Sequence, residues 1–366
     1  MGDRALNIWP QDLRNFTQSV LRNVGIEQRF AEETAWALVE ADRRGVFTHG
    51  VAGGSGLDDL LQRVEKGGIN LAARPRLVEP QKYAAIAAID ADGAVGHSVA
   101  VTAARQAKAL AAKFGAAKVY VYNSTHFGAA GVYADLIAED GQFMGKVTCN
   151  SPAWMIPFSH SGRGKKRLGT NPIAWSIPYK GGCMTLDMAT TQIAVSRAML
   201  AAKNNQSTVD PVDIPPDYMV DERYDVITRP VTVQQLKSGS ALPLGGRTFG
   251  YKGFGLALCV ELDLIVGGAI GRPIPTGSRT AEGRVAQSFE AWALDAFGDS
   301  GETLTRITDA IASVRSHGAS GGRLPGEAEA IQSVKSDNKG ICYSTEQWER
   351  LDRIAHKINV ELATRF

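Results

Sequence analysis

The chain has 366 residues, of which 44% are apolar and 21% are charged, the balance of an ordinary globular protein. This length predicts a large core that is divided between two lobes. The formal net charge of +2 excludes the strong positive field of a protein that binds nucleic acid or an anionic membrane. No segment approaches the ~20 apolar residues that cross a bilayer, and the N-terminus lacks the apolar core of a signal peptide.

The sequence predicts no metal site and no disulfide framework. The four cysteines, Cys149, Cys183, Cys259 and Cys342, lie far apart and form no CxxC pair. HExxH and clustered aspartates are absent as well. Unpaired cysteines are typical of a reducing compartment, so we expect a cytoplasmic protein.

The first part of the chain is expected to be helical. Pro10 precedes a run with apolar residues near helical spacing, and a second run, AEETAWALVEADRRG, ends at Gly45. Residues 57–66 form a third amphipathic segment, which Gly67 and Gly68 close.

Near residue 80 the pattern changes to strands alternating with helices. A strand runs into a Gly-rich turn over residues 83–96, and residues 98–113 and 129–139 are expected to be helical. Further strands are predicted over residues 117–124, 143–152, 172–179 and 182–189.

The last third begins with residues 204–248, which are rich in Pro, Asp and Gly and have no clear period. Such a stretch is typical of a lid or binding loop. Residues 253–270 predict an apolar helix. The C-terminal stretch predicts an amphipathic helix that starts with a capping box of Ser344 and Gln347. Its apolar face would carry Trp348, Leu351, Ala355, Ile358 and Leu362. The fold class is therefore α/β, with helical segments at both ends that we expect to pack together.

Two of the six histidines stand in segments that suit catalysis. Histidine exchanges protons near neutral pH. His49 follows the helix that stops at Gly45, and the hydroxyl of Thr48 beside it is suited to fix its tautomer. His126 lies between a strand and a helix, where α/β proteins bind ligands and where helix N-termini attract phosphate. A structural histidine remains the alternative at position 49, and a tight structural turn at position 126.

Standard nucleotide-binding motifs are missing. No GxGxxG follows the first strand, and GRGKKRLGT lacks Walker A spacing. The basic cluster over residues 163–167 (RGKKR) is either a solvated loop or a contact for phosphate or another anion.

Six segments, in order along almost the whole chain, together resemble the malate/L-lactate dehydrogenase family of the non-Rossmann type. They are ADRRGVFTHGV (41–51), YNSTHFGAAGVYA (122–134), LGTNPIAWSIP (168–178), TLDMATT (185–191), GYKGFGLALCVELDL (250–264) and RLPGE (323–327). The resemblance implies a largely antiparallel sheet flanked by helices, a helical lobe and a homodimer. We expect the helical, substrate-side lobe to comprise residues 1–75 with 305–366, and the cofactor-binding α/β domain to comprise residues 76–304.

The resemblance also implies roles for residues. His49 matches the proton donor, and Thr48 stands where a Ser usually assists it. Thr170 matches a contact on the substrate side. The cofactor contacts would be His126, Phe127, Gly128, Ala129, Ala130, Asp187, Met188, Ala189, Tyr251, Lys252, Arg323 and Gly326.

The chain departs from the family pattern at the substrate site. Gly53 stands where an Arg usually grips the substrate carboxylate, and Leu57 stands where a Tyr is common. A guanidinium contributes about 1.5–3 kcal/mol per charge-assisted hydrogen bond, which Gly cannot replace. Three explanations are open: a substrate without a carboxylate there, another cation such as Arg44 or Arg167, or impaired catalysis. We favour the first. No acidic relay partner for the histidine is identified in the segment after residue 191.

The sequence therefore predicts an NAD(P)H-dependent reductase or dehydrogenase that acts on a C=O or C=N bond of a small molecule. The altered pocket favours an atypical substrate such as a cyclic imine or a biosynthetic intermediate. Arg197 is suited to a 2′-phosphate, which favours NADP over NAD. The alternative is that Arg197 is a surface residue with no cofactor contact. The alternative function is a non-catalytic relative that binds the dinucleotide or a partner.

Overall fold

The computed structural model describes residues 6–78, 82–159, 164–196, 217–227, 233–268, 284–318 and 322–362. The chain divides into two compact units. Unit 1 comprises Met1–Val147, Ala174–Asp187 and Ser288–Phe366, and unit 2 comprises Thr148–Ile173 and Met188–Gln287. The domain boundaries expected from the sequence stay a prediction.

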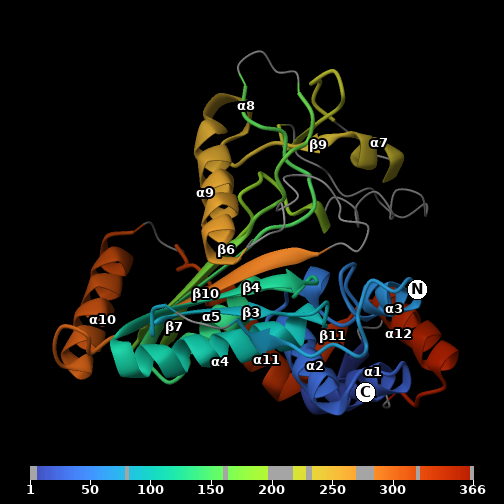
Figure 1. Ribbon diagram of the computed structural model, residues 1–366, viewed down its shortest axis with the longest axis horizontal. Coiled ribbons are helices and arrows are strands. Elements are labelled where there is room, and N and C mark those ends of the chain that lie inside the picture. The colour runs from blue at the N-terminus through green and yellow to red at the C-terminus, as the bar shows by residue number, and fades with distance from the viewer. Residues whose placement is uncertain are drawn as a thin grey trace. The chain divides into compact units, whose positions relative to one another are not determined.

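Both ends of the chain meet in the helical part of unit 1. The helices are α1 (Pro10–Asn23), α2 (Gln28–Arg43), α3 (Leu57–Glu65) and α12 (Thr345–Ile358). Strand β1 (Leu6–Ile8) pairs antiparallel with β11 (Ile341–Tyr343), and one apolar cluster includes side chains from all of these elements. Figure 1 shows the blue N-terminal helices beside the red C-terminal one. The expectation that the two ends pack together is confirmed.

Local sequence explains where two of these helices begin. Pro10 occupies the first turn of α1, where its missing N–H is not needed. The predicted capping box at the start of α12 is present, with both hydrogen bonds between Ser344 and Gln347. Trp348 and Leu351 on the predicted apolar face are buried.

A seven-stranded, mostly antiparallel sheet confirms the expected fold class. Its order is β2 (Arg76–Leu77), β3 (Ile86–Asp90), β4 (Ala116–Ser124), β10 (Val285–Ala293), β5 (Phe143–Cys149), β6 (Ile173–Tyr179) and β7 (Gly182–Met188). Strands β3 and β4 are parallel, with Ile86 opposite Lys118, and α4 (Gly96–Phe114) connects them. The other described helices of unit 1 are α5 (Ala130–Ala138), α10 (Ser300–His317) and α11 (Glu327–Lys339), with a 3-10 turn η1 (Phe47–His49).

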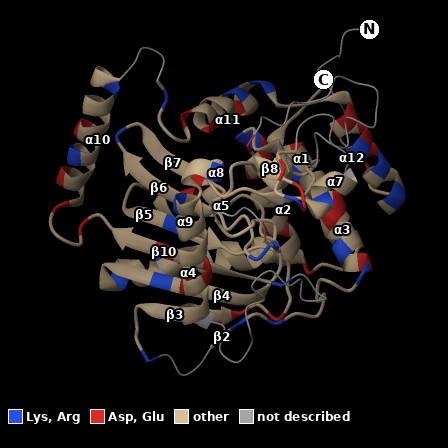
Figure 2. Cartoon of the chain, turned by 90° about the horizontal axis from the view of Figure 1, so that it is seen from above, with Lys and Arg blue, Asp and Glu red and all other residues tan. Residues whose placement is uncertain are grey.

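Both signs of charge are intermixed on the exposed helices. Figure 2 shows blue and red residues alternating along α3, α10 and α12. This pattern agrees with the small net charge of the sequence.

Unit 2 contains the long apolar helix that the sequence predicts, α9 (Tyr251–Gly268). Its shorter elements are β8 (Met219–Val220), α7 (Val233–Ser238), β9 (Ser240–Ala241) and α8 (Gly246–Phe249). The stretch 204–248 therefore has regular structure in part, while residues 204–216 and 228–232 lie outside the described residues. Among the helices that the structure describes, none combines the length and apolar character needed to traverse a bilayer.

Candidate active site

The His49 turn follows α2 directly. Gly45 has a φ of +77°, the left-handed conformation that ends the helix and lets the chain turn into η1. Thr48 Oγ1 lies 2.9 Å from His49 Nδ1, as the neighbouring hydroxyl in the sequence leads one to expect. Loss of surrounding water lowers the pKa of His49 to about 4, so the ring is neutral near pH 7.

The His126 loop lies where the sequence predicts it, between the end of β4 and the start of α5. Gly128 has a φ of +82°, and its N–H donates to His126 Nδ1 at 3.3 Å. Helix α5 has Ala129 at its N-cap, with no side-chain cap hydrogen bond. In place of an N-cap side chain, the carboxylate of Asp187 accepts from the N–H of Gly131 in the first turn of this helix.

A third imidazole, which the sequence analysis does not single out, belongs to the same place. His97 is the second residue of α4, and the start of that helix packs tightly on the His126 loop. Gly96 N–H donates to Thr125 Oγ1 at 2.9 Å, and a β-carbon on Gly96 would lie 2.1 Å from the Thr125 carbonyl oxygen. This close approach places the His97 ring against Gly128.

The three imidazoles form one cluster. The rings of His49 and His126 are nearly parallel with centroids 5.8 Å apart, and the rings of His97 and His126 are 6.2 Å apart. Burial, then the positive charges of Arg63 and His49, lower the pKa of His97 to about 3. Burial and the neighbouring imidazoles also lower the pKa of His126 well below its usual range. All three rings are therefore neutral near pH 7.

His97 is also an exception to the pairing of buried polar groups. Its side chain is buried, yet neither ring nitrogen has a hydrogen-bond partner within the described part of the chain. A neutral imidazole always carries one N–H donor, and an unpaired buried donor costs about 1–3 kcal/mol. Such an exception needs an explanation, which a water molecule or a ligand at the cluster would provide.

Asp42 of α2 lies beneath the His49 turn. Its Oδ2 accepts hydrogen bonds from Val51 N–H at 2.6 Å and from the Tyr343 hydroxyl at 2.5 Å. The carboxylate fills the space next to Gly50, because a β-carbon there would lie 1.9 Å from Asp42 Oδ1. The signal that could have identified this residue is an aspartate on an otherwise apolar helix face just before the His49 turn.

Gly53 is a packed position. A β-carbon on it would lie 2.3 Å from the Phe47 carbonyl oxygen and 2.6 Å from that of Thr48. The backbone of this turn therefore accommodates only glycine at position 53. Arg44, an alternative cation in the sequence analysis, is engaged with Asp135 and Glu40.

Two further predicted segments of unit 1 meet at the end of β7. Gly131 of α5 donates its N–H to Asp187 Oδ2 at 2.8 Å. Gly326, with a φ of +78°, packs on Thr185, since a β-carbon there would lie 2.7 Å from the Thr185 carbonyl oxygen. Arg323 in the same segment is exposed. These contacts join the segments 122–134, 185–191 and 323–327, three of the six that carry the resemblance.

The Thr170 segment is fixed within unit 2. Thr170 N–H donates to Ser151 Oγ at 2.9 Å, and Thr190 N–H donates to the Thr170 carbonyl oxygen at 2.9 Å. Next to it, Asn171 and Asn150 both donate to the buried carboxylate of Glu261, whose pKa is raised by burial. This network of two amides and a carboxylate was missed because its members are far apart in sequence.

The remaining predicted contacts are less enclosed. Tyr251 is exposed at the start of α9, and the Lys252 ammonium lies 5.9 Å from the centroid of its ring. Met188 and Ala189 begin the second segment of unit 2. Arg197 lies outside the described residues. Among the residues that the structure describes, no group of three or more His, Cys, Asp or Glu side chains is placed to hold a metal ion.

Comparison with known proteins identifies the family. A family model described as malate/L-lactate dehydrogenase matches residues 8–352. The chain belongs to the malate/L-lactate dehydrogenase family. The malate/(S)-sulfolactate dehydrogenase of Methanothermus fervidus is 28% identical over 365 residues, with 97% of this chain and 99% of the relative covered. The ureidoglycolate dehydrogenase (NAD(+)) of Escherichia coli K12 is 30% identical over 73% of this chain and 70% of its own length.

The fold agrees with this assignment. The solved structure of malate dehydrogenase from Pyrococcus horikoshii OT3 superposes with a TM-score of 0.83 at 26% identity. The superposition covers 98% of this chain and 97% of that one. The resemblance inferred from the six sequence segments is therefore confirmed.

Proposed function

We propose that this chain is an NAD(P)-dependent oxidoreductase in which His49 exchanges a proton with the substrate oxygen or nitrogen. The observation that carries the proposal is the 2.9 Å approach of Thr48 Oγ1 to His49 Nδ1. When Nδ1–H donates to this oxygen, Nε2 is the nitrogen that faces the reaction. With Thr48 as the acceptor at Nδ1, His49 can serve both directions of the reaction. Its Nε2 donates a proton as imidazolium during reduction and accepts a proton as neutral imidazole during oxidation.

The described residues fit a dinucleotide beside this histidine. Gly128 leaves its position free of a side chain, and the ring nitrogens of His97 have no partner among the described residues. The loop His126–Ala130 would hold the cofactor from the α5 side, with Asp187 next to Gly131. A bound nicotinamide would supply the hydride or accept it.

Either dinucleotide is compatible with the family. The ureidoglycolate dehydrogenase above is named for NAD(+), and a (2R)-3-sulfolactate dehydrogenase of Chromohalobacter salexigens, 30% identical over 247 residues, is named for NADP(+). Our preference for NADP rests on Arg197 and stays a prediction. So do the homodimer and the cytoplasmic location.

The substrate is proposed to be a ketone or cyclic imine that is not gripped through a carboxylate at position 53. The close packing of Gly53 on the Phe47 and Thr48 carbonyl oxygens supports this, because an arginine does not fit this backbone. Within unit 1 the three imidazoles are neutral, and Arg63, whose positive charge acts on His97 and His126, is hydrogen-bonded to Asp59.

The test combines three variants with a substrate panel. Consumption of NADPH or NADH is followed by absorbance with keto acids, ketones and cyclic imines. His49→Ala should lower kcat/KM by at least about a hundredfold, the usual contribution of a general acid or base, while the Kd of the reduced cofactor stays unchanged. Thr48→Val should lower kcat/KM, and Thr48→Ser should restore most of it, because a hydroxyl is sufficient.

Three results would count against this function. Full activity of His49→Ala would remove the histidine from the mechanism. An unchanged rate in Thr48→Val would show that the hydrogen bond does not matter. Cofactor binding without turnover across the whole panel would favour the alternative, a non-catalytic relative that binds the dinucleotide or a partner.

A further inference from the structure

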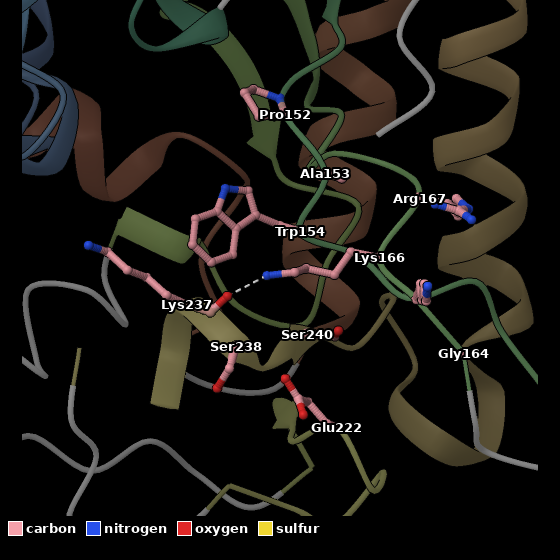
Figure 3. Close-up of a pocket in the computed structure, with 11 residues that line it drawn as sticks. Pro152, Ala153, Trp154, Gly164, Lys166, Arg167, Glu222, Lys237, Ser238 and Ser240 are labelled. Atoms are coloured by element: carbon pink, nitrogen blue, oxygen red, sulfur yellow. Dashed lines mark hydrogen bonds between the residues drawn. The ribbon is translucent and has the colours of Figure 1, made fainter. Parts of the chain in front are cut away.

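A second candidate ligand site lies within unit 2. A cavity of about 1170 Å³ opens between three chain segments, namely residues 152–154, 164–167 and 237–240, with Glu222 at its wall (Figure 3). Sites for small organic ligands usually have volumes of roughly 300–1,000 Å³, so this cavity is large enough for a molecule of nucleotide size. The RGKKR motif of the sequence contributes Lys165, Lys166 and Arg167 to the lining.

Hydrogen bonds connect the three walls. The backbone N–H of Trp154 donates to the Leu168 carbonyl oxygen at 2.8 Å, and the backbone N–H of Ala241 donates to the Trp154 carbonyl oxygen at 2.8 Å. The Lys166 ammonium donates to the Lys237 carbonyl oxygen at 2.6 Å and lies 4.9 Å from the centroid of the Trp154 ring. Figure 3 shows this ammonium next to the indole and bonded to the carbonyl. The cavity is thus framed by backbone pairing rather than by side chains alone.

The lining carries a clear excess of positive charge. The lining residues include four cations, Lys165, Lys166, Arg167 and Lys237, and one carboxylate, that of Glu222. Ion pairs join many other cations of the chain to carboxylates, but no such pair involves Lys165, Arg167 or Lys237 among the residues that the structure describes. Cations that gather in a concave site without acidic partners attract anions.

We propose that this cavity binds an organic phosphate of nucleotide size. Lys165 and Arg167 supply donors for phosphate oxygens, since lysine and arginine are the usual phosphate ligands. The Trp154 indole offers an aromatic surface for a base, and the Ser238 and Ser240 hydroxyls are partners for a sugar. An inorganic ion alone would leave most of the volume to water. The ligand that we propose is a free nucleotide, separate from the dinucleotide of the proposed function.

Binding is measured by calorimetry on the full-length protein with ADP, ribose 5-phosphate, adenosine and inorganic phosphate. We expect ADP to bind more tightly than ribose 5-phosphate, and adenosine to bind weakly. The double variant Lys165→Ala/Arg167→Ala should weaken ADP binding by about a hundredfold, since each of the two lost charge-assisted contacts contributes a factor of about ten. Trp154→Leu should reduce the advantage of ADP over ribose 5-phosphate.

A matched control removes the same charge elsewhere. Lys335→Ala/Lys339→Ala changes two exposed lysines of α11, in unit 1, and should leave ADP binding unchanged. Equal weakening by both double variants would reduce the effect to net charge and overturn the proposal. Absence of ADP binding to the wild-type protein would overturn it as well.

Two further measurements test whether this site is independent of the dinucleotide site and of His49. If NADPH competes with ADP, the bound ADP reports the dinucleotide site, and the proposal of a separate nucleotide site is overturned. If ADP binds equally well in the presence of saturating NADPH, the ligand is a separate nucleotide. His49→Ala should bind ADP as the wild-type protein does, so a failed assignment of His49 would leave this result standing.

Discussion

The Tyr343 hydroxyl donates a 2.5 Å hydrogen bond to Asp42 Oδ2, although the two residues are 301 positions apart in sequence. Val51 N–H donates to the same oxygen at 2.6 Å. One carboxylate thus holds α2, the turn that follows His49, and the C-terminal strand β11 together. Burial, opposed by these two hydrogen bonds, raises the pKa of Asp42 to about 7.

This raised pKa makes stability depend on pH. In the unfolded chain Asp42 loses its proton near pH 3.8, the ordinary pKa of an aspartate, whereas the folded protein keeps the proton up to about pH 7. The folded state therefore binds more protons in this window, and stability is lost as pH rises from about 4 to about 7. A difference of about three pKa units corresponds to about 4 kcal/mol as an upper bound.

Asp42→Asn should remove this part of the pH dependence. The free energy of unfolding in urea, measured for both proteins between about pH 4.5 and about pH 8, should favour the variant increasingly as pH rises, up to a plateau. Tyr343→Phe removes a hydrogen bond that lowers the pKa of Asp42, so it should extend the window to higher pH. A pH-independent difference between Asp42→Asn and wild type would contradict this account.

The pKa of His49 predicts different pH profiles of kcat/KM for reduction and for oxidation. With a pKa of about 4 in the free enzyme, the imidazolium becomes tenfold rarer with each pH unit above that value. The kcat/KM for reduction should therefore fall about tenfold per unit from about pH 5 to about pH 8, while the kcat/KM for oxidation should be flat with respect to this group. A plateau of the reductive kcat/KM between about pH 6 and about pH 8 would rule out His49 as the proton donor in this state.

Position 53 should tolerate no side chain, whereas position 54 should. In Gly53→Ala the β-carbon meets the carbonyl oxygens of Phe47 and Thr48, so the His49 turn must shift. We expect a loss of about 1–3 kcal/mol in unfolding free energy and at least a tenfold drop in kcat/KM. Gly54→Ala is the matched control, because nothing lies within 4 Å of its β-carbon. Similar behaviour of the two variants would show that the turn is not packed as described.

His97 should matter more for activity than for stability. Its unpaired nitrogens make no hydrogen bond with the described residues, so His97→Leu should unfold at the same temperature as the wild type or above it. If a ligand or water pairs with this ring during the reaction, His97→Leu should lower kcat/KM about tenfold, and His97→Gln should retain more activity because it keeps a donor and an acceptor. Wild-type kinetics in His97→Leu would show that the ring is only a packing element.

The sequence predicts elements whose signal is local. The alternation of β4, the apolar face of α12 and the capping box at Ser344 depend on neighbouring residues, and all three are present. Strand β10 was not anticipated, and residues 305–366 were expected to be helical without the bounds of α10 and α11. Strand β10 lies between two other strands and is mostly buried along its length, so it lacks the alternation that marks a half-exposed strand. Helix α10 is mostly exposed and lacks a buried face to give it a period.

In the candidate site, too, the residues that the sequence predicts are those with a local signal. Thr48, His49 and the His126 loop were found because they stand in short motifs at element ends. His97 and Asp42 were not, since each acquires its surroundings only when distant segments pack: the His126 loop on α4, and β11 on α2. The close contacts of Gly53 likewise depend on the path of the backbone rather than on residue type.

The place of β10 has a consequence for synthesis on the ribosome. Strands β4 and β5 are consecutive in the chain, yet β10 separates them in the sheet. Until residues 285–293 emerge, both strands present unpaired edges, which are templates for aggregation. Truncated chains that end before Val285 should therefore be insoluble or bound to chaperones. In the nascent protein, the seven-stranded sheet stays incomplete until β10 has been synthesised.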